Sequence, residues 1–429
     1  MNHQPNNLGF HISDRIQGDK HISININNVI ACIHKGRLIL IMSRMLKPTI
    51  ISIAMATVMA GAAISPALGL IAAQFPDADP VMIKLVLTAP SLFIIPFSFL
   101  SSYLTKKISK RSIVLWGLAI YILTGVGAQF TNSIEMLLAF RFLLGAGVGL
   151  VMPLSFTLIS DHFKGKEQVK MMGYNTAFSN VGGIVTMLLA GYLASFNWRV
   201  PFNVYWIGLI IFVLVFLYLP KNKPIKPLDG EAKKGIPLSV YGLALAACVI
   251  MMVYYAVATN MALYLEQNHL GNSKVAGLVM SFTTVGGMIT SIILVRLQDL
   301  FKSYIMLVSL LVMGIAFGLL SISNSIIVVL VSVCLIGFGQ GVIFPLINVK
   351  TLNSVDPSIT DRVIAIVSSL IYIGQFLSPI VFDSISRLAG IPTIRFQYTV
   401  IAAGLIISVV IMMLVKFAIS KGKTAVKQA

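Results

Sequence analysis

The sequence predicts an all-α membrane protein with twelve transmembrane helices in two pseudo-symmetric six-helix halves. Three observations support this prediction. Of the 429 residues, 57% are hydrophobic and only 11% are charged, long apolar runs recur along the chain, and one short motif occurs twice. Soluble domains carry roughly 25% charged residues, so this chain has too little polar surface to face water on all sides.

The apolar runs exceed the ~18 residues that indicate a membrane-spanning helix. Lipid cannot hydrate unpaired backbone groups, so only helices and closed barrels span it, and runs without a two-residue alternation favour helices. The predicted spans are residues 48–75, 81–105, 112–131, 134–160, 171–196, 200–220, 237–264, 276–296, 304–322, 326–349, 363–383 and 396–418.

Lys and Arg are distributed unequally between alternate connections. Sixteen lie in the connections at 106–111, 164–170, 221–234, 296–302 and 350–362, whereas the opposite set holds five: Lys84, Arg199, Lys274, Arg387 and Arg395. Because basic loops stay in the cytoplasm, we expect the first set and both termini there, in a multi-pass protein of the inner or plasma membrane. The net charge of +18 then reflects topology and does not indicate a nucleic-acid partner.

The chain divides into five expected regions. They are a polar, disordered extension (1–46), a first bundle (47–220), a Pro-, Lys- and Gly-rich cytoplasmic linker (221–236), a second bundle (237–419) and a cytoplasmic tail (420–429). A purine-rich ribosome-binding sequence can encode Lys35-Gly36-Arg37, shortly upstream of Met42 and Met45. We therefore also expect that translation of the natural protein starts at one of these methionines.

Cysteine and histidine limit the cofactors that the chain can hold. The three cysteines, Cys32, Cys248 and Cys334, form no C-x-x-C pair, and all six histidines lie outside the predicted spans. Disulfide frameworks, metal sites and haem need such ligands in suitable positions. We expect no cofactor and no metal.

The pattern G-x-G-x-G-x-x-x-P-L occurs at 145–154 and again at 337–346, 192 residues later. The same offset carries Gly182 onto Gly374. Five identical positions in ten indicate a duplicated unit, and duplicated halves that hold a substrate between them are a known transporter architecture. The repeat supplies the candidate gating positions Gly145, Gly147, Gly149, Pro153, Gly337, Gly339, Gly341 and Pro345.

With these motifs the chain resembles the major facilitator superfamily after about residue 46, and most nearly its twelve-helix drug/proton antiporter group. The strongest family motif is R-x-x-x-G-x-G, at Arg141, Gly145 and Gly147. The resemblance implies alternating access by the two halves and a role for Arg141 in proton coupling. A charge inside the bilayer costs ~2.5–3.5 kcal/mol on insertion scales, so such a residue faces a cavity or partner unless it snorkels to the interface.

Two other family motifs are degenerate. The acidic residue of the family's loop between the second and third helices is Lys106 here, whereas the second half keeps an acid, Asp299, in the corresponding loop. We therefore expect gating roles for Lys106 and Asp299, with Asp299 beside residues 170–173 in the outward-open state. The Gly-Pro pair of the antiporter motif falls on Thr186 and Met187, which weakens the inference to export.

A proton-coupled carrier needs a titratable group that its cavity can reach. No acid lies near the centre of a predicted span, and the candidates are Glu266 and Asp383, at the outer ends of their helices. Arg141 stays protonated, so it would act by biasing a neighbouring carboxyl toward proton release, and Glu266 is the expected partner. The competing interpretations are a solvated helix-end carboxylate for Glu266 and an ordinary interfacial anchor for Asp383.

In the family, the first, fourth, seventh and tenth helices line the central cavity, with help from the second, fifth, eighth and eleventh. Polar and aromatic residues on these helices are the candidate substrate contacts, although polar groups in lipid also join helices. A cavity without acids suits neutral, amphiphilic or anionic solutes. The candidates are Asn175, Asn180, Tyr254, Tyr255, Asn260, Gln340, Tyr372 and Gln375.

These observations predict a secondary active transporter, and not an enzyme, that exports small amphiphilic compounds in exchange for protons. An uptake symporter or uniporter for an organic anion or metabolite, with Arg141 as counter-ion, is a second interpretation. A non-transporting membrane receptor or scaffold is a third. The expected partners are a small-molecule substrate, protons and the lipid bilayer, and the chain is expected to be monomeric.

Overall fold

The computed structural model describes residues 45–221, 236–355 and 360–428, and every regular element in these ranges is a helix. The predicted disordered extension up to residue 44, the candidate start at Met42 and nearly all of the predicted linker lie outside the described residues. The fold class is therefore all-α, as the apolar runs predict.

The N-terminal helices are those that precede residue 222. The first span, Met45–Gln74, is interrupted at residues 63–64 and ends in η1 (Ser65–Ala67) and α2 (Leu68–Gln74). It is followed by α3 (Pro80–Leu104), α4 (Lys110–Gly127), η2 (Ala128–Phe130), α5 (Ile134–His162), α6 (Gly165–Ala194), η3 (Val200–Trp206) and α7 (Ile207–Tyr218).

The C-terminal helices are those that follow residue 235. They are α8 (Leu238–Gln267), α9 (Ser273–Phe301), η4 (Lys302–Tyr304), α10 (Ile305–Ile322), α11 (Ile326–Asn353), α12 (Thr360–Leu388) and α13 (Ile394–Gln428). The observed boundaries differ from the predicted ones by a few residues in most helices. α13 continues to Gln428, through most of the residues that we expected as a tail.

Polar side chains cap several helices where the chain leaves the apolar zone. Asp79 accepts a hydrogen bond from the Val81 amide at the start of α3, and Asn272 does the same for the first amides of α9. Such caps satisfy amides that have no partner inside the helix. α6 begins at Gly165, six residues before the predicted start at 171, and so takes Lys166 and Lys170 into its first turns.

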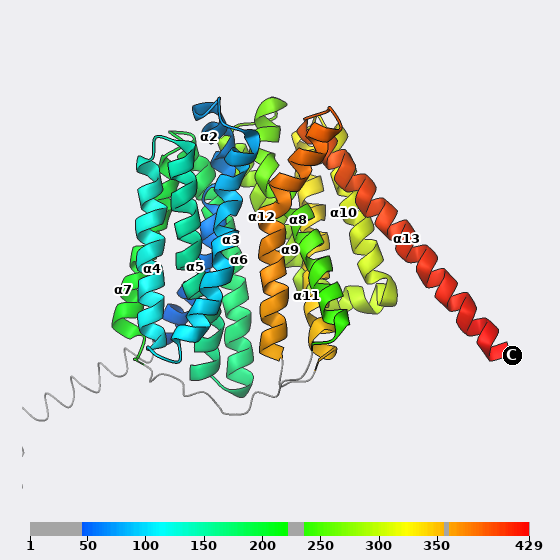
Figure 1. The fold of residues 1–429 in the computed structure, drawn as a ribbon, viewed down its shortest axis with the longest axis horizontal. Coiled ribbons are helices and arrows are strands. Elements are labelled where there is room, and N and C mark those ends of the chain that lie inside the picture. The colour runs from blue at the N-terminus through cyan, green and yellow to red at the C-terminus, as the bar shows by residue number, and fades with distance from the viewer. Residues whose placement is uncertain (1–44, 222–235, 356–359, 429) are drawn as a thin grey trace, which may run out of the picture.

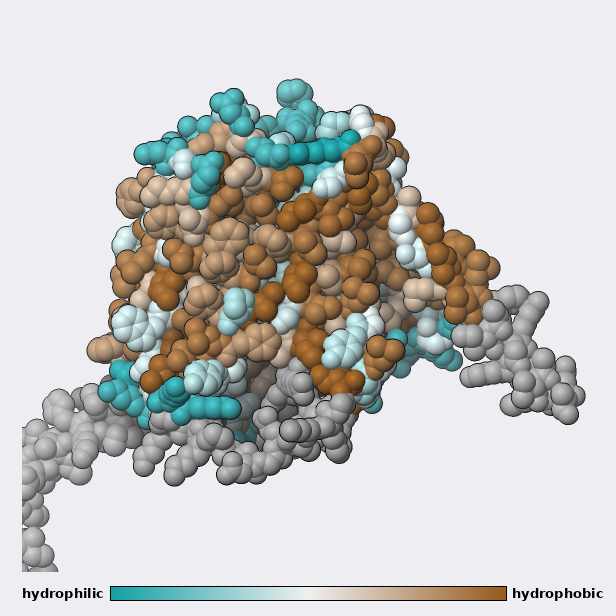
Figure 2. All heavy atoms as spheres, in the orientation of Figure 1, coloured by the Kyte–Doolittle hydropathy of each residue, from teal (hydrophilic) through white to brown (hydrophobic). Residues whose placement is uncertain are grey.

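Eleven segments of the described chain are long and apolar enough to cross a membrane. The longest, Ser273–Ile322, contains both α9 and α10, which are joined by η4. On the face drawn in Figure 2, an apolar band crosses the middle of the molecule, and hydrophilic residues gather at its two ends. The chain is a multi-pass membrane protein.

The N-terminal and C-terminal helices pack mainly among themselves. α5 contacts α3 and α4, and α11 contacts α9 and α10, while the pairs α3–α12 and α6–α9 connect the two sets (Figure 1). Helix contacts of this kind need small residues: a Cβ on Gly145 would lie 2.2 Å from the Pro90 carbonyl oxygen, and one on Gly337 would lie 1.9 Å from that of Thr283. The repeated glycines therefore allow helices to touch.

Two names are used below for the ends of the molecule. The Pro80 end is the end at which α3 begins, at the top of Figure 1, and the Leu104 end is the one at which α3 finishes. α2, the start of α9 and the start of α13 lie at the Pro80 end.

Candidate functional site

A cavity of about 560 Å³ lies between the N-terminal and C-terminal helices. The first span and α3, α5, α6, α8, α9, α11 and α12 all contribute to its wall. None of the described residues that line it is an Asp, Glu, Lys, Arg or His. Its polarity comes instead from hydroxyl, amide and phenol groups set among Ala, Gly, Leu and Met.

Seven of the eight residues proposed as substrate contacts line this cavity: Asn175, Asn180, Tyr254, Tyr255, Gln340, Tyr372 and Gln375. The eighth, Asn260, does not line it. Its side chain is buried toward the Pro80 end, where Nδ2 donates to Gln397 Oε1 at 3.1 Å.

Several contacts give the cavity a defined shape. Ser91 Oγ donates to Gln375 Oε1 at 2.7 Å and so joins α3 to α12. The Tyr372 hydroxyl lies 2.6 Å from the sulfur of Met152, on α5. The cavity is therefore spanned by side chains from both sets of helices.

Sequence reasoning missed the small hydroxyl residues of the wall, such as Ser91, Ser155 and Ser291. A signal was present on α6, where Thr176 and Ser179 lie within a turn of the predicted Asn175 and Asn180. Residues three or four apart share a helix face, so the helical period alone could have extended the set.

At the Pro80 end, two contacts join the N-terminal helices to the C-terminal helices. Lys84 Nζ on α3 lies 2.5 Å from Asp383 Oδ1 on α12. Ser65 Oγ donates to the Ala258 carbonyl oxygen at 2.7 Å, which joins η1 to α8. Lys84 was assigned above to a connection between spans, but it lies inside α3 and is 3% exposed, so that assignment was wrong.

A second ion pair lies further out on the same two helices. Arg387 on α12 donates to Asp79, the N-cap of α3, and both side chains are more than two-fifths exposed. The Arg387 guanidinium, with help from the Val81 amide, holds the pKa of Asp79 below its ordinary value.

Asp383 was predicted as a proton-coupling candidate, and its side chain is buried in a polar cluster. Besides Lys84, its Oδ1 accepts a hydrogen bond from Gln397 Nε2 at 2.6 Å, while Oδ2 has no partner among the described residues. Only 6% of the residue is exposed. The competing interpretation, an ordinary interfacial anchor, would place the side chain at the surface, whereas it is buried.

Arg141 is also buried, with 1% exposed, but its partners are uncharged. Nε donates to the Val86 carbonyl oxygen (2.6 Å), Nη1 to the Tyr205 hydroxyl (2.6 Å) and Nη2 to the Ala60 carbonyl oxygen (2.9 Å). The snorkelling interpretation does not fit, because the side chain points into the protein. Among the described residues no carboxylate forms an ion pair with it.

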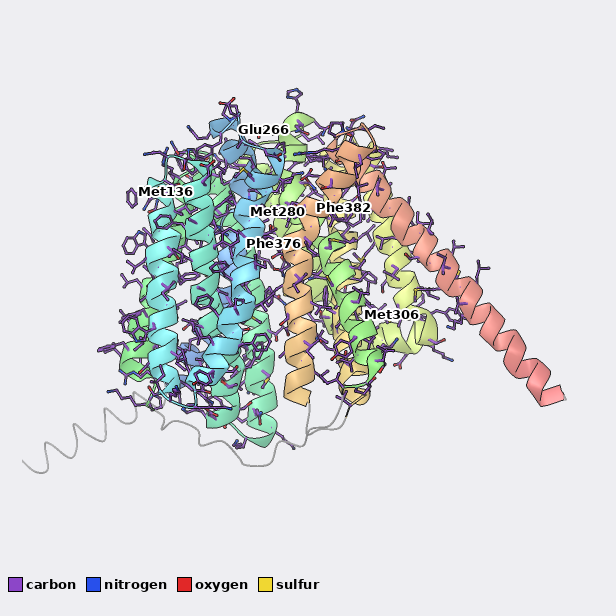
Figure 3. The ribbon with its side chains drawn as sticks, in the orientation of Figure 1. Met136, Glu266, Met280, Met306, Phe376 and Phe382 are labelled. Carbon is purple, nitrogen blue, oxygen red and sulfur yellow. The ribbon has the colours of Figure 1, made fainter. Side chains whose placement is uncertain are left out.

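Glu266, the expected partner of Arg141, lies at the Pro80 end (Figure 3). It is exposed and lines a separate cavity of about 720 Å³ together with His269 and Trp198. Its carboxylate packs onto Gly69, where a Cβ would lie 2.2 Å from Oε2. The structure therefore does not bring Glu266 to Arg141.

The remaining gating candidates are at helix ends or in helix interiors. Lys106 and Asp299 are both exposed, while Pro153 and Pro345 lie inside α5 and α11. An ion pair that the sequence did not suggest joins Lys110 to Asp161 at 2.7 Å, at the Leu104 end. The described residues hold no group of three or more side chains arranged to bind a metal ion.

An all-helical, multi-span chain with a polar but uncharged cavity between two sets of helices has the architecture of a membrane transporter. The sequence model described as the Major Facilitator Superfamily matches residues 49–379 and 243–428. The chain therefore belongs to the Major Facilitator Superfamily, and it is a transporter rather than an enzyme.

The relatives of this chain carry different names. The uncharacterized MFS-type transporter YceJ of Bacillus subtilis (strain 168) is 25% identical over 288 residues, which are 65% of this chain and 73% of that protein. The multidrug transporter protein MdtP of the same organism is 25% identical, over 31% of this chain and 23% of MdtP. The niacin transporter NiaP of Acinetobacter baylyi (strain ATCC 33305 / BD413 / ADP1) is 24% identical, over 29% and 28%.

A solved structure gives an independent comparison of the fold. A bacterial homolog to the human lysosomal transporter Spinster, in an inward-facing and occupied conformation, has a TM-score of 0.64 at 14% identity and covers 86% of this chain and 94% of that chain. At such low identity the likeness establishes the shared fold alone.

Proposed function

We propose that this chain is a secondary active transporter that works by alternating access and exports small amphiphilic compounds in exchange for protons. The observation that carries the proposal is the central cavity, whose described lining residues are uncharged and which lies between two sets of helices that contacts join at the Pro80 end. A volume of about 560 Å³ falls within the usual range of roughly 300–1,000 Å³ for small-molecule sites.

Alternating access in this family architecture needs two similar halves, and the helix contacts support six helices in each. Gly145 contacts Pro90 on α3, and Gly337 contacts Thr283 on α9. The two glycines are 192 residues apart in the sequence, and their two partners are 193 residues apart. Likewise Gly182 packs on Met55, and Gly374 packs on Cys248. The duplicated motif thus makes the same kind of contact twice, and counting α9 and α10 separately gives twelve spans.

The distribution of basic residues supports the orientation. Among the described members of the basic set, Lys106 and Lys107 follow the end of α3, and Lys166 and Lys170 lie in the first turns of α6. The positive-inside rule assigns such a basic end, here the Leu104 end, to the cytoplasm. The Pro80 end is then the outer end, both termini are cytoplasmic, and the contacts at the Pro80 end form an outer gate. In this proposal the structure represents an inward-facing state with that gate closed.

The cavity wall favours uncharged or amphiphilic substrates. Three tyrosines and Met152 and Met251 offer apolar surface, while amides such as Asn175 and Gln340 offer hydrogen bonds. A strongly cationic compound would lose its hydration without gaining a carboxylate. The relative MdtP is named a multidrug transporter protein, which agrees with export of amphiphilic compounds.

Uptake of an organic acid or metabolite is the second candidate. The degenerate antiporter motif at Thr186 and Met187 favours this candidate. The relative NiaP, which is named a niacin transporter, agrees with it. Arg141 does not support this candidate as a counter-ion, because it does not line the cavity and its guanidinium donates to three acceptors of the protein.

The proposal is tested with the full chain in proteoliposomes, across a panel of amphiphilic drugs, organic acids and metabolites. We expect accumulation driven by an imposed pH gradient, and counterflow exchange without one, for at least one uncharged or amphiphilic compound. Asn175→Ala and Gln340→Ala should weaken apparent affinity, whereas Gly404→Ala, which has open space around it, should not.

Each outcome of that experiment decides between the candidates. Counterflow that ignores the pH gradient would overturn proton coupling and favour a uniporter. Accumulation of organic acids in the direction of the proton gradient would favour uptake. Absence of counterflow for the whole panel would favour a receptor or scaffold.

A further inference from the structure

A second cavity, of about 720 Å³, lies at the Pro80 end and shares no lining residue with the central cavity. Both sets of helices form its wall. α2 and the end of α6 contribute one side, and the end of α8 and the start of α9 contribute the other. Its volume falls within the range of roughly 300–1,000 Å³ that is usual for small-molecule sites.

The charge of this cavity is negative, in contrast to the central one. Its described lining residues include one acid, Glu266, and no Lys or Arg. The basic residues that follow two of the lining residues are directed elsewhere. The Lys274 ammonium lies 5.1 Å from the centre of the Tyr192 ring, and the Arg199 guanidinium donates to two backbone carbonyl oxygens. Among the described residues, no basic side chain forms an ion pair with Glu266.

The Glu266 carboxylate lies where the two sets of helices meet. Glu266 belongs to α8, and its side chain rests on Gly69 of α2, where a Cβ would collide with Oε2. The absence of a side chain on Gly69 therefore gives the carboxylate its place. Glu266 is also exposed, at the top of Figure 3, so a molecule in the surrounding water can reach it.

The N-terminal side of the cavity holds a donor without an acceptor. Trp198 lines the cavity and is 4% exposed, and its indole Nε1 has no hydrogen-bond partner among the described residues. The ring is fixed in place, because Arg199 stacks 4.4 Å from it and Phe75 and Phe202 pack against it at 5.6 and 6.2 Å. Buried donors are nearly always paired, so this N–H requires an acceptor that the described chain does not supply.

We propose that this cavity, called the outer site below, binds small aromatic ammonium compounds that carry a hydrogen-bond acceptor, and that occupancy holds the Pro80 end closed. The ammonium lies against the Glu266 carboxylate, and the acceptor takes the hydrogen bond of the Trp198 N–H. The apolar part packs on wall residues such as Leu70 and Phe196. Binding does not depend on transport, whereas the closing effect rests on the proposed alternating access.

Other classes of ligand fit the outer site less well. An organic anion would meet the Glu266 carboxylate without a basic partner in the described wall. A metal ion would lack ligands, because the described residues hold no group of three or more ligating side chains. A purely apolar molecule would bury the carboxylate and the indole N–H without giving either a partner.

Occupancy affects the conformation because the wall is shared between the two sets of helices. The outer site is complete while α2 and α6 lie beside α8 and α9. Opening of the Pro80 end would move Glu266 away from Trp198, so a ligand that contacts both residues binds the closed form better and raises its population. A ligand of the outer site is therefore expected to inhibit transport from the outside.

Binding is tested by equilibrium dialysis of three probes against the full chain in lipid nanodiscs at neutral pH. Tyramine carries the ammonium and a hydroxyl acceptor, phenethylamine lacks the acceptor, and phenylpropionate carries the opposite charge. Tyramine should bind most tightly and phenylpropionate most weakly. Glu266→Gln should weaken the binding of both amines about tenfold, the loss of one charge-assisted hydrogen bond. Trp198→Phe keeps an aromatic ring and should weaken tyramine alone, by about fivefold.

Two further variants separate the site from a general effect of charge. Glu135→Gln makes the same substitution at an exposed acid at the start of α5, outside the cavity, and should bind both amines as the parent does. Gly69→Ala keeps the charge but displaces the flexible end of the Glu266 side chain, and should weaken both amines. Glu266 is exposed and has no ion pair among the described residues, so Glu266→Gln should keep the parent's Tm without ligand.

The closing effect is measured on the full chain with its cysteines replaced and Ala258→Cys introduced on the wall of the central cavity. In right-side-out vesicles, a membrane-impermeant thiol reagent reaches this cysteine when the Pro80 end opens. Saturating tyramine outside should slow the labelling severalfold in the parent and leave it unchanged in Glu266→Gln.

The outer site is wrong if Glu266→Gln binds tyramine as tightly as the parent does, or if phenylpropionate binds as tightly as tyramine. Labelling that ignores tyramine would overturn the closing effect. Neither measurement needs a transported substrate. A failure of counterflow in proteoliposomes would therefore overturn the proposed transport activity and leave both of these results readable.

Discussion

The Arg141 guanidinium donates a 2.6 Å hydrogen bond to the carbonyl oxygen of Val86, and that carbonyl is the one that Pro90 leaves without a helical donor. The same side chain donates to the Ala60 carbonyl oxygen, just before the interruption of the first span at residues 63–64. Arg141 thus supplies hydrogen bonds that two broken helices lack. Buried carbonyls without a partner are costly, so this role is structural.

Arg141→Ala should therefore lower stability and reduce every mode of transport together. Loss of the guanidinium leaves the Val86 carbonyl unsatisfied, at about 1–3 kcal/mol, whereas the Ala60 carbonyl keeps its hydrogen bond from the Tyr205 hydroxyl. We expect a lower Tm in detergent and an equal loss of counterflow and of pH-driven accumulation. The hypothesis that Arg141 couples protons predicts something different, namely that counterflow survives while accumulation fails.

Pro90→Ala provides a matched background for this measurement. An alanine at position 90 can donate its amide to the Val86 carbonyl, so the stability cost of Arg141→Ala should be smaller in the Pro90→Ala protein than in the parent. Equal costs in both backgrounds would show that the bond to Val86 contributes nothing.

Gly145→Ala tests the close contact of α5 with α3. The added Cβ would meet the Pro90 backbone at 2.2 Å, and backbone cannot move aside as a flexible side chain can. Overpacking of this kind costs about 1–3 kcal/mol or more, which should appear as a lower Tm. Gly173→Ala is the control, since nothing lies within 4 Å of its Cβ. A Tm for Gly145→Ala equal to that of the control would contradict the contact.

The sequence predicts the cavity better than it predicts the gate. Tyr372 and Gln375 were selected because the family resemblance assigns their helix to the cavity wall and because their side chains are polar. Lys84 was missed, because it stands near the start of an apolar run and its partner Asp383 is 299 residues away. A single sequence holds no signal that brings those two helix ends together. Arg141 was expected to face a cavity or a partner unless it snorkelled, but two of its three acceptors are backbone carbonyls, which every residue carries.

The orientation is tested by cysteine labelling of the cytoplasmic and outer connections. Because sixteen basic residues in one set of connections, against four in the other once Lys84 is placed inside α3, favour one side, a cysteine within 221–235 should react only from the cytoplasm. A cysteine at Asn268, which is partly exposed beyond the end of α8, should react with an impermeant reagent only from outside. The opposite pattern would reverse the gate assignments made above.

The pair formed by Asp79 and Arg387 should contribute no pH dependence in the physiological range. The pKa of Asp79 is lowered when Arg387 holds it, so the pair's contribution to gate closure is fully present above the ordinary Asp value of about 3.9. It is lost only as the pH falls through the lowered pKa.

Between about pH 5 and pH 8, Asp79 is ionised whether or not the pair is formed. Asp79→Asn should therefore leave the pH profile of transport unchanged. Added salt should mask the small effect of this variant on transport, because the pair is exposed. The measurement is pH-driven flux of the parent and Asp79→Asn across that range at low and high salt. A profile that shifts with Asp79→Asn would assign proton sensing at the outer gate to the exposed pair.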